Sequence, residues 1–303
     1  MVAKFKRIVT WLTINSRYVF NLIRFNKNRL DTGLTCIIFS RDRAMQLDAL
    51  LRSIELYSLS SFNVIIQYSC SDIHRNSYEK LKKNYIKYEF IEESSFMNTL
   101  QSIVQSIQTS CLFFLVDDQV FIRPFNIMEI LQKMKKNTFF SLRLGRCIID
   151  FGIYHERLYP IYKVLEGDFL IWKWRENIYQ KDWGYQFSVD GTVYRTLDII
   201  RAMMAITFKA PNSFEDNMNK VCFFRKDNVG ISYFNPVVIN LIINASRHEK
   251  AYEHFESGEY TTDDMLKLWE RGFSLSLDKI ASIPFSATHY IVDDIRTILC
   301  EPK

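Results

Sequence analysis

The chain has 303 residues, of which 48% are hydrophobic, 15% aromatic and 24% charged, with only 9 glycines and 6 prolines. This composition excludes disordered, collagen-like and low-complexity chains and is sufficient for a large buried core. The six cysteines stand singly without CxxC spacing, so they indicate reduced thiols in a cytosolic compartment rather than a zinc site or a disulfide scaffold.

Positive charge is concentrated at the start of the chain. The net charge is +5, and residues 1–30 contain seven cations and no acid, with large apolar side chains between them. A helix would sort these residues into an aromatic face and a basic face, which predicts a peripheral segment on an anionic membrane. Each Lys or Arg near such a surface contributes roughly 1 kcal/mol. The cations are Lys4, Lys6, Arg7, Arg17, Arg24, Lys27 and Arg29.

Other interpretations of this segment remain. The apolar run 8–14 is too short to span a bilayer and no small-residue cleavage site follows it, so neither a crossing helix nor a signal peptide is predicted. A solvated basic arm or an ordinary first helix is the alternative to membrane binding. Because the excess charge stops at Arg29 and does not recur as a stripe, no nucleic-acid partner is expected.

After Asp31 the chain alternates short β-branched or aromatic runs with helical periodicity. Ser40 or Asp42 is a predicted cap for the first helix of this region. The alternation predicts βαβ units and a mostly parallel sheet, in which sites lie beyond the carboxyl ends of strands. Strands are predicted over 34–40, 63–69, 88–92, 111–116 and 138–144, and helices over 43–57, 74–85, 96–108 and 126–136.

The remaining chain is aromatic-rich and less regular. Helices are predicted over 197–207, 214–224 and 261–271, the last with Thr261 and Asp264 spaced as a capping box, and an extended segment over 235–244. No repeat or long linker is visible. The predicted organisation is therefore a membrane-associating segment 1–30, a catalytic core 31–235 and a carboxyl-terminal extension 236–303 packed on that core.

Adjacent carboxylates leave the strand predicted over 111–116. Asp117 and Asp118, followed by Gln119, come directly after an apolar run. Two like charges at a strand end repel unless a cation or donors neutralise them, and hard cations such as Mg²⁺ or Mn²⁺ prefer oxygen ligands. A solvated turn with an Asp cap is the alternative.

Two further segments carry candidate chemistry. Ser40, Arg41, Asp42 and Arg43 follow the first strand, where guanidinium groups and a helix amino terminus can engage phosphate. Pro211 and Ser213 indicate a helix start that holds Glu215 and Asp216 in its first turn, where the macrodipole stabilises an ionised base. Each of these groups also has an ordinary structural explanation as a cap or a surface charge.

The order of these motifs resembles GT-A glycosyltransferases, and is similar to the family 2 enzymes that build bacterial surface polysaccharides such as capsule and lipopolysaccharide. The resemblance is carried by Thr35-Cys-Ile-Ile-Phe-Ser-Arg-Asp-Arg, a strand followed by Asp72, Phe113-Phe-Leu-Val-Asp-Asp-Gln, Phe187-Ser-Val-Asp-Gly-Thr and Phe214-Glu-Asp. It implies an α/β GT-A fold, with a Rossmann-like, mostly parallel sheet flanked by helices and a carboxyl-terminal helical extension.

The resemblance also implies roles for individual residues. The residues that would bind the nucleotide sugar are Ser40, Arg41, Arg43, Asp72 and Asp117. A Mn²⁺ or Mg²⁺ ion would be held by Asp117, Asp118 and His289, and Glu215 or Asp216 would be the base. The residues that would contact the acceptor are Trp183, Asp190 and Gly191. The family usually has a metal-binding carboxylate where this chain has Gln119, so stabilisation by Arg or Lys is the alternative to a metal. Trp172, Trp174, Trp183 and Tyr185 are candidate apolar platforms for sugar rings, and core packing is the alternative for each of them.

The implied reaction moves a sugar from a nucleoside diphosphate sugar, with uridine diphosphate as the expected carrier, to a hydroxyl of a growing glycan. A lipid-linked acceptor would place the enzyme at the inner, cytoplasmic face of the membrane, where the basic segment would hold it. A non-catalytic, membrane-bound binding or assembly subunit is the alternative, favoured by Gln119.

Overall fold

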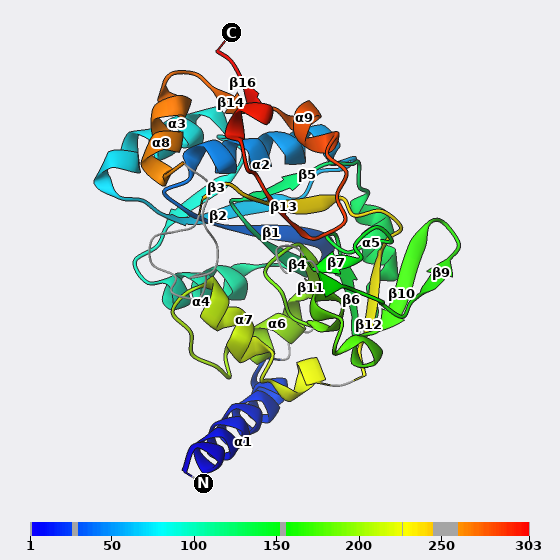
Figure 1. Cartoon of the computed structure of the whole chain (residues 1–303). Coiled ribbons are helices and arrows are strands. Elements are labelled where there is room, and N and C mark those ends of the chain that lie inside the picture. Colours follow the sequence, from blue (N-terminus) through cyan, green and yellow to red (C-terminus); the bar gives the residue numbers. More distant parts are fainter. Residues whose placement is uncertain (1, 26–29, 152–155, 226, 245–259, 303) are drawn as a thin grey trace.

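The structure is a computed structural model that describes residues 2–25, 30–151, 156–225, 227–244 and 260–302. Its centre is a nine-stranded sheet with the order β3-β2-β1-β4-β11-β6-β12-β10-β9 (Figure 1). The strands of this sheet are β1 Asp31–Arg41, β2 Asn63–Ser69, β3 Glu89–Glu92, β4 Thr109–Val116, β6 Thr138–Ser141, β9 Lys163–Leu165, β10 Phe169–Lys173, β11 Thr192–Arg195 and β12 Val229–Tyr233.

The first four strands of the sheet order are parallel, as predicted. β1 pairs with β2 on one side and β4 on the other, with Arg41 opposite Ser69 and Phe39 opposite Val116. The carboxyl ends of these strands therefore meet at one edge. β11 runs antiparallel to both β4 and β6, so it is the amino-terminal end of β11 that reaches the same edge.

Helices cover both faces of the sheet (Figure 1). One layer contains α2, α3 and α8 with α5 beside them, and the opposite layer contains α4, α6 and α7. This two-sided cover explains the continuous apolar runs 36–39 in β1 and 111–116 in β4, since strands buried on both faces do not alternate. The helices are α2 Ala44–Tyr57, α3 Arg75–Asn84, α4 Phe96–Ser106, α5 Ile127–Lys133, α6 Thr196–Met203, α7 Pro211–Met218, α8 Thr262–Glu270 and α9 Leu277–Ala281.

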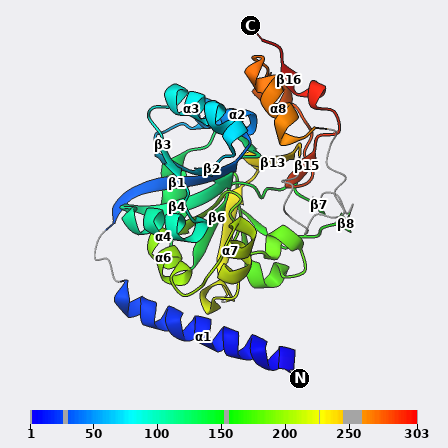
Figure 2. The same ribbon diagram turned by 90° about the vertical axis from the view of Figure 1, so that its left-hand side faces the viewer.

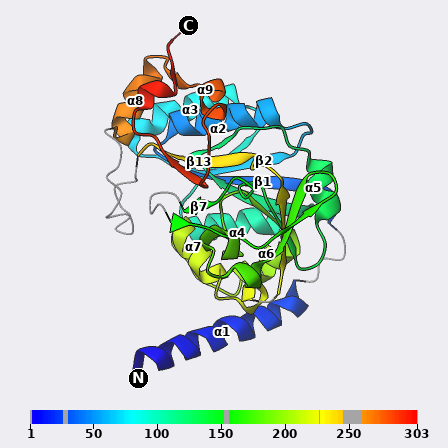
Figure 3. The ribbon, with the colours of Figure 1, turned by 45° about the vertical axis from the view of Figure 1, so that its right-hand side comes forward.

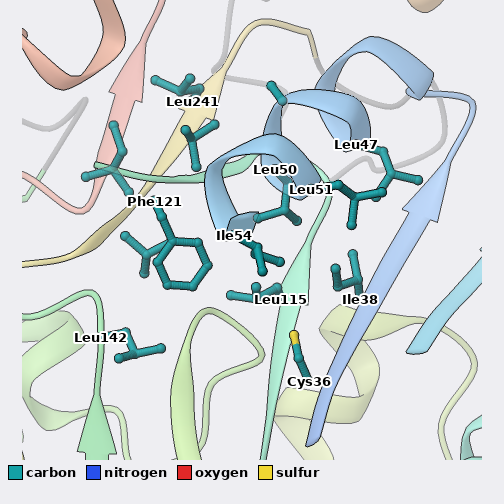
Figure 4. Close-up of a cluster of buried hydrophobic side chains, with 14 of the residues drawn as sticks. Cys36, Ile38, Leu47, Leu50, Leu51, Ile54, Leu115, Phe121, Leu142 and Leu241 are labelled. Atoms are coloured by element: carbon teal, nitrogen blue, oxygen red, sulfur yellow. The ribbon is translucent and has the colours of Figure 1, made fainter. Parts of the chain in front are cut away.

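The larger core lies between the sheet and α2. Leu47, Leu50, Leu51 and Ile54 of α2 face Ile38 of β1 in this cluster (Figure 4), and each is at most 3% exposed. The i, i+3, i+4, i+7 spacing of the α2 residues is the pattern from which the helix was predicted. Burying a Leu or Ile side chain contributes roughly 1.5–3 kcal/mol, so this face fixes α2 and the loop that precedes it.

The carboxyl-terminal part contains short strands as well as the predicted helices. β13, Val238–Ile242, lies between β5, Gln119–Phe121, and β15, His289–Ile291, in a three-stranded sheet. β14, Ser274–Leu275, pairs with β16, Leu299–Cys300. The capping box of α8 is formed as expected, because the Thr261 Oγ1 accepts from the Asp264 amide while the Asp264 carboxylate accepts from the Thr261 amide.

The first helix, α1 Val2–Arg24, lies beneath the α6 and α7 layer, away from α8, α9 and the carboxyl terminus (Figures 2 and 3). It contacts the body through Ile14, Asn15, Tyr18 and Asn21, which are all buried. No described helix is long and apolar enough to cross a bilayer. Lys27 and Arg29 of the basic segment lie outside the described residues.

Candidate active site

The loops that follow β1 and β2 are joined at the carboxyl edge of the sheet. The Asp42 carboxylate accepts hydrogen bonds from the Ser71 amide at 2.7 Å and the Ser71 hydroxyl at 3.1 Å, and Asp42 has φ +54°. Ser40 is buried, and its hydroxyl lies 2.6 Å from the Tyr78 hydroxyl. Neither side chain caps α2, so that prediction was wrong: both side chains bond across the fold instead.

Asp117 ties the end of β4 to the loop after β1. Its carboxylate accepts from the Arg41 amide at 3.0 Å and from the Arg43 guanidinium at 3.2 Å. The same guanidinium nitrogen lies 3.8 Å from the Asp118 carboxylate. Arg43 also donates to the Asn244 carbonyl at 2.8 Å, and its side chain is 13% exposed. The two adjacent aspartates therefore have an arginine as their counter-ion.

A second charged cluster enters from the other side of β4. Asp190 stands two residues before β11, and because β11 is antiparallel to β4 this residue lies near Asp118 at the sheet edge. Its carboxylate accepts from the Arg143 guanidinium at 2.8 Å, and a second nitrogen of Arg143 donates to Asp182 at 3.2 Å. Asp182 in turn accepts from the Thr288 hydroxyl at 2.6 Å. Arg143 is only 4% exposed, so both ion pairs are largely shielded from water.

Asn240 connects the two clusters. Its amide nitrogen lies 3.4 Å from the Asp118 carboxylate and 3.3 Å from the Asp190 carboxylate, and its carbonyl oxygen accepts from Gln119 at 3.2 Å. Gln119 and Asn240 are register partners on β5 and β13, and the Gln119 side chain also accepts from the Val116 amide. Gln119 is fully buried, so it orients Asn240 from behind the aspartates.

His289 lies on the other side of Asn240, as its register partner on β15. Its ring is 3.5 Å from Arg143 and 3.1 Å from the Thr288 hydroxyl. Burial and the neighbouring Arg143 lower the pKa of His289, although Asp182 and Asp190 oppose the shift. The neutral ring is therefore favoured beside the arginine.

Glu215 reaches the site from α7. Pro211 is the first residue of that helix, as expected, and the Glu215 carboxylate accepts from the Val189 amide at 2.6 Å, next to Asp190. Burial, together with the charge of Asp190, raises the pKa of Glu215 from 4.5 to about 8. The expectation that Glu215 and Asp216 lie in the first turn of this helix was wrong, because α7 begins at Pro211 and its first turn contains no acidic residue. The macrodipole effect falls off beyond the first turn, so it does not outweigh burial and the like charge at Glu215. Asp216, the next residue, is exposed.

Asp118 also holds its proton more tightly than an ordinary carboxyl. Burial raises the pKa of Asp118 from 3.8 to about 7, with Asp117 and Asp190 adding to the shift and Arg43 opposing it. Asp118 and Glu215 therefore both titrate close to neutral pH. Perturbed groups gathered at one edge of a sheet are typical of catalytic sites.

The arrangement does not fit a divalent ion held by Asp117, Asp118 and His289. The Arg43 guanidinium stands beside both aspartates, and Asp117 additionally accepts from a backbone amide. His289 is a neighbour of Arg143, a cation that would repel the ion. Among the described residues, no group of three His, Cys, Asp or Glu side chains is arranged to hold a metal.

Some predicted residues lie apart from these clusters. Asp72 is next to Ser71 at the edge, and its side chain is fully exposed, 3.8 Å from Arg75. Trp183 is completely buried, donates to the Ile148 carbonyl and offers no face to a sugar. A Cβ on Gly191 would meet side chains of Val238 and Leu142, so this glycine serves close packing with φ +72°. The core interpretation of the three tryptophans is confirmed, with each at most 3% exposed.

Sequence reasoning missed Arg143, Asp182 and Asn240. A signal existed for two of them: Arg143 is a charged residue at the end of the strand predicted over 138–144, and Asn240 interrupts the apolar run of β13. A buried polar residue in such a run needs a partner, which points to a role in a network. Asp182 lies in an irregular segment that gives no comparable signal.

A mostly parallel sheet covered by helices, with polar groups at the carboxyl edge of β1, β2 and β4, is the α/β architecture that the resemblance predicts. The bifunctional glycosyltransferase pgtA of Dictyostelium discoideum is 27% identical to this chain over 219 residues. The match covers 63% of this chain and 28% of that protein, so the chain spans little more than a quarter of its relative. The predicted resemblance to GT-A glycosyltransferases is thus confirmed. No protein-family model matches the chain.

Solved structures that match parts of the chain include S. aureus TarS 1-349, with 12% identity, a TM-score of 0.43, and coverage of 68% of this chain and 59% of that one. For TarS 1-349 in complex with UDP, the sequence identity is 11% and the TM-score is 0.41, and the match covers 66% of this chain and 60% of that one. For the mannosyltransferase PcManGT from Pyrobaculum calidifontis, in complex with GDP-Man and Mn2+, the sequence identity is 12% and the TM-score is 0.31. That match covers 46% of this chain and 45% of the mannosyltransferase chain.

Proposed function

We propose that this chain is a glycosyltransferase that moves a sugar from a nucleoside diphosphate sugar to a hydroxyl of a glycan. One observation carries the proposal: the Arg43 and Arg143 clusters lie at the same edge of the sheet, together with the Glu215 carboxyl, whose pKa is raised. Its sequence relative is a glycosyltransferase, which supports the same class of reaction. A uridine diphosphate sugar is the first donor to test.

The donor's diphosphate would lie against the loop after β1. Arg41 is exposed there, Arg43 is partly exposed, and the amino terminus of α2 points its amides toward the same edge. When the bond between the anomeric carbon and the diphosphate breaks, the electron pair stays on the diphosphate oxygen. Fixed guanidinium groups and amides stabilise that developing charge, and such preorganised groups are usually the largest catalytic contribution.

Glu215 would act as the base. The acceptor oxygen forms the new bond to the anomeric carbon, and its proton passes to the Glu215 carboxylate. A base is most effective when its pKa lies near the working pH, which the raised pKa of Glu215 supports. Asp216, the other candidate, is exposed on the same helix and serves as the matched control.

The test is release of nucleoside diphosphate from a panel of nucleotide sugars, with and without glycan acceptors. Glu215→Gln should lower the rate by about 10²-fold or more, a typical general-base contribution, whereas Asp216→Asn should stay close to wild type. Equal rates for Glu215→Gln and wild type would refute the assignment of the base. No turnover of any donor by wild type would refute the transferase.

A peripheral position on an anionic membrane, at its cytoplasmic face, is the second part of the proposal. Nine large apolar side chains of α1 are at least 39% exposed, and Arg7, Arg17 and Arg24 are exposed on the same helix. Exposed apolar surface of this size marks an interaction site, and the cations favour anionic lipid. The apolar residues are Phe5, Ile8, Val9, Trp11, Leu12, Val19, Phe20, Leu22 and Ile23. A lipid-linked glycan is the acceptor that such a location supports.

Cosedimentation with vesicles of neutral and anionic phospholipid tests this part. Replacing Phe5, Phe20 and Ile23 by Ser should abolish sedimentation with anionic vesicles, because these are the most exposed apolar residues of α1. Ile86→Ser is the matched control, since Ile86 is 86% exposed but lies in the turn between α3 and β3. Unchanged binding by the triple variant would contradict a docking role for α1.

A non-catalytic nucleotide-sugar-binding subunit is the second candidate. It is favoured by Gln119, which occupies the place of an expected carboxylate and is fully buried behind Asn240. Thermal stabilisation by a nucleotide sugar that wild type neither hydrolyses nor transfers would support this candidate and exclude the first.

A further inference from the structure

Two tyrosines are strongly exposed in the segments that precede Asp182. Tyr159 is 74% exposed and Tyr179 is 83% exposed, and Ile161 and Ile178 are also more than half exposed. Large apolar side chains are normally exposed singly, whereas a group from two neighbouring segments marks an interaction surface. We call these four residues the tyrosine surface.

Hydrogen bonds between the two segments hold the tyrosine surface in place. The Tyr159 amide donates to the Gln180 side chain at 2.7 Å, and the Ile161 amide donates to the Asn177 side chain at 2.8 Å. Asn177 is fully buried and returns a bond to the Ile161 carbonyl at 3.0 Å. Tyr159 is therefore placed beside Gln180, the residue that follows Tyr179.

The base of this surface is rigid. Leu158 is buried, and Tyr162 stacks on Trp183 with the ring centroids 5.6 Å apart and an angle of 18° between the planes. Trp183 packs in turn against Trp172 in the core. Because alternate residues of 158–162 are anchored inward, Tyr159 and Ile161 point outward in a fixed arrangement. A preformed surface loses little entropy when it binds a partner.

A short stretch of chain connects the tyrosine surface to the second charged cluster. Tyr179 is three residues before Asp182, whose carboxylate bonds to Arg143 in the second charged cluster. The Trp183 amide donates to the Gln180 carbonyl, so the short helix η4, Lys181–Gly184, begins at the tyrosine surface and carries Asp182. Tyr179 is therefore separated by only three residues from the carboxylate that pairs with Arg143.

The charges around the tyrosine surface are balanced. Lys181 pairs with Glu156 at 3.1 Å, Arg157 with Asp150 at 3.1 Å, and Lys173 with Glu176 at 3.4 Å. This differs from α1, where residues 1–30 hold cations and no acid. A surface of tyrosine faces among paired charges suits a neutral, polyhydroxylated ligand and has no excess charge to attract an anionic bilayer.

We propose that the tyrosine surface binds the sugar units of a neutral glycan acceptor next to the reacting hydroxyl, in the place that Trp183 was expected to fill. Sugar rings present patches of C–H groups that stack on aromatic faces, while their hydroxyls stay in water. Tyrosine supplies such a face at low entropic cost. This inference rests on the proposed transferase and names the part of the site that selects its acceptor.

The experiment measures binding without any donor. Wild type and the double variant Tyr159→Ala, Tyr179→Ala are applied to an array of neutral gluco-, galacto-, manno- and chito-oligosaccharides. The double variant should bind the recognised glycan at least about tenfold more weakly, whereas Tyr159→Phe with Tyr179→Phe should stay within about threefold, because the ring faces remain. Ile86→Ala is the control for an equally exposed apolar side chain outside the surface.

Kinetics with the best glycan then separate binding from chemistry. The Ala variants should raise the acceptor KM by the same factor and leave donor hydrolysis within about twofold of wild type. The proposal would be overturned if wild type bound no glycan, or if the Tyr159→Ala, Tyr179→Ala double variant bound glycan as tightly as wild type. It would also be overturned if the only effect of these substitutions were a loss of self-association. If wild type binds a glycan and turns over no donor, and the double variant loses that binding, the glycan-binding role of the tyrosine surface is supported and the transferase is refuted.

Discussion

Removing the Arg143 guanidinium should destabilise the whole fold, and Arg143→Met is the sharpest test of the second charged cluster. Arg143 is 4% exposed and neutralises Asp190 at 2.8 Å and Asp182 at 3.2 Å. Methionine retains much of the apolar stem but leaves two shielded carboxylates without their cation. Breaking a buried ion pair from one side costs about 3–5 kcal/mol in the free energy of unfolding.

Urea unfolding at neutral pH measures this loss, with Arg157→Met as the matched control. Arg157 lies 3.1 Å from Asp150, but its side chain is 54% exposed, so that pair contributes about 0–1 kcal/mol. Adding Asp182→Asn and Asp190→Asn to Arg143→Met should recover most of the lost stability, because no buried charge then lacks a partner. Equal losses for Arg143→Met and Arg157→Met would refute the buried cluster.

The pH dependence of the Arg143→Met loss has a definite sign. Burial would raise the pKa of Asp182, but Arg143, His289 and the Thr288 hydroxyl outweigh it and lower the pKa below its ordinary value of 3.8. This pair therefore stabilises wild type above about pH 4, and the contribution is lost as the pH falls through the lowered pKa. The difference between wild type and Arg143→Met should accordingly shrink under acid conditions. A constant difference down to low pH would contradict the coupling to Asp182.

Three further predictions concern Glu215, Arg43 and Gly230. The pKa of Glu215 is raised to about 8 in the folded protein, from an ordinary value of 4.5. Between these two pH values the folded protein binds a proton that the unfolded chain does not, so the free energy of unfolding of wild type falls as the pH rises through this range. Glu215→Gln should thus be the more stable protein above pH 8, by a few kcal/mol in urea unfolding, and no gain would contradict the raised pKa. Arg43→Met frees the aspartate pair, so Mn²⁺ should raise the melting temperature of this variant more than that of wild type; equal shifts would refute Arg43 as the counter-ion. Gly230→Ala places a methyl group into the indole of Trp172 and should cost about 1–3 kcal/mol in thermal unfolding, whereas an unchanged melting temperature would show that the ring moves freely.

Much of the sheet was predictable because its strands are short apolar runs. Asn63–Ser69 was predicted with the bounds that β2 has, and the helix over 43–57 is α2 within one residue. The rule that sites lie beyond the carboxyl ends of strands also pointed to the loops after β1, β2 and β4, which the structure brings together at one edge. Local patterns carry the information that a strand exists but not all of its ends, since β1 and β4 begin three and two residues before the strands predicted over 34–40 and 111–116.

The network within the site was not predictable, because it depends on distant pairing. Asn240 contacts Asp118 and Asp190 only because β13 pairs with β5 in one register. The failed cap of α2 has the same cause, since Tyr78 and Ser71 come from other segments. Nothing in the neighbourhood of Glu215 in the sequence indicates the burial that raises its pKa.

The antiparallel course of β11 constrains how this protein can change length over evolution. Asp190 stands two residues before Thr192, the first residue of β11, and successive residues of a strand face opposite sides. An insertion or deletion of one residue between Asp190 and Thr192 would turn the carboxylate away from Arg143 and Asn240. Tolerated gaps should therefore fall outside this short stretch, in the exposed connections of the long segment between β6 and β11.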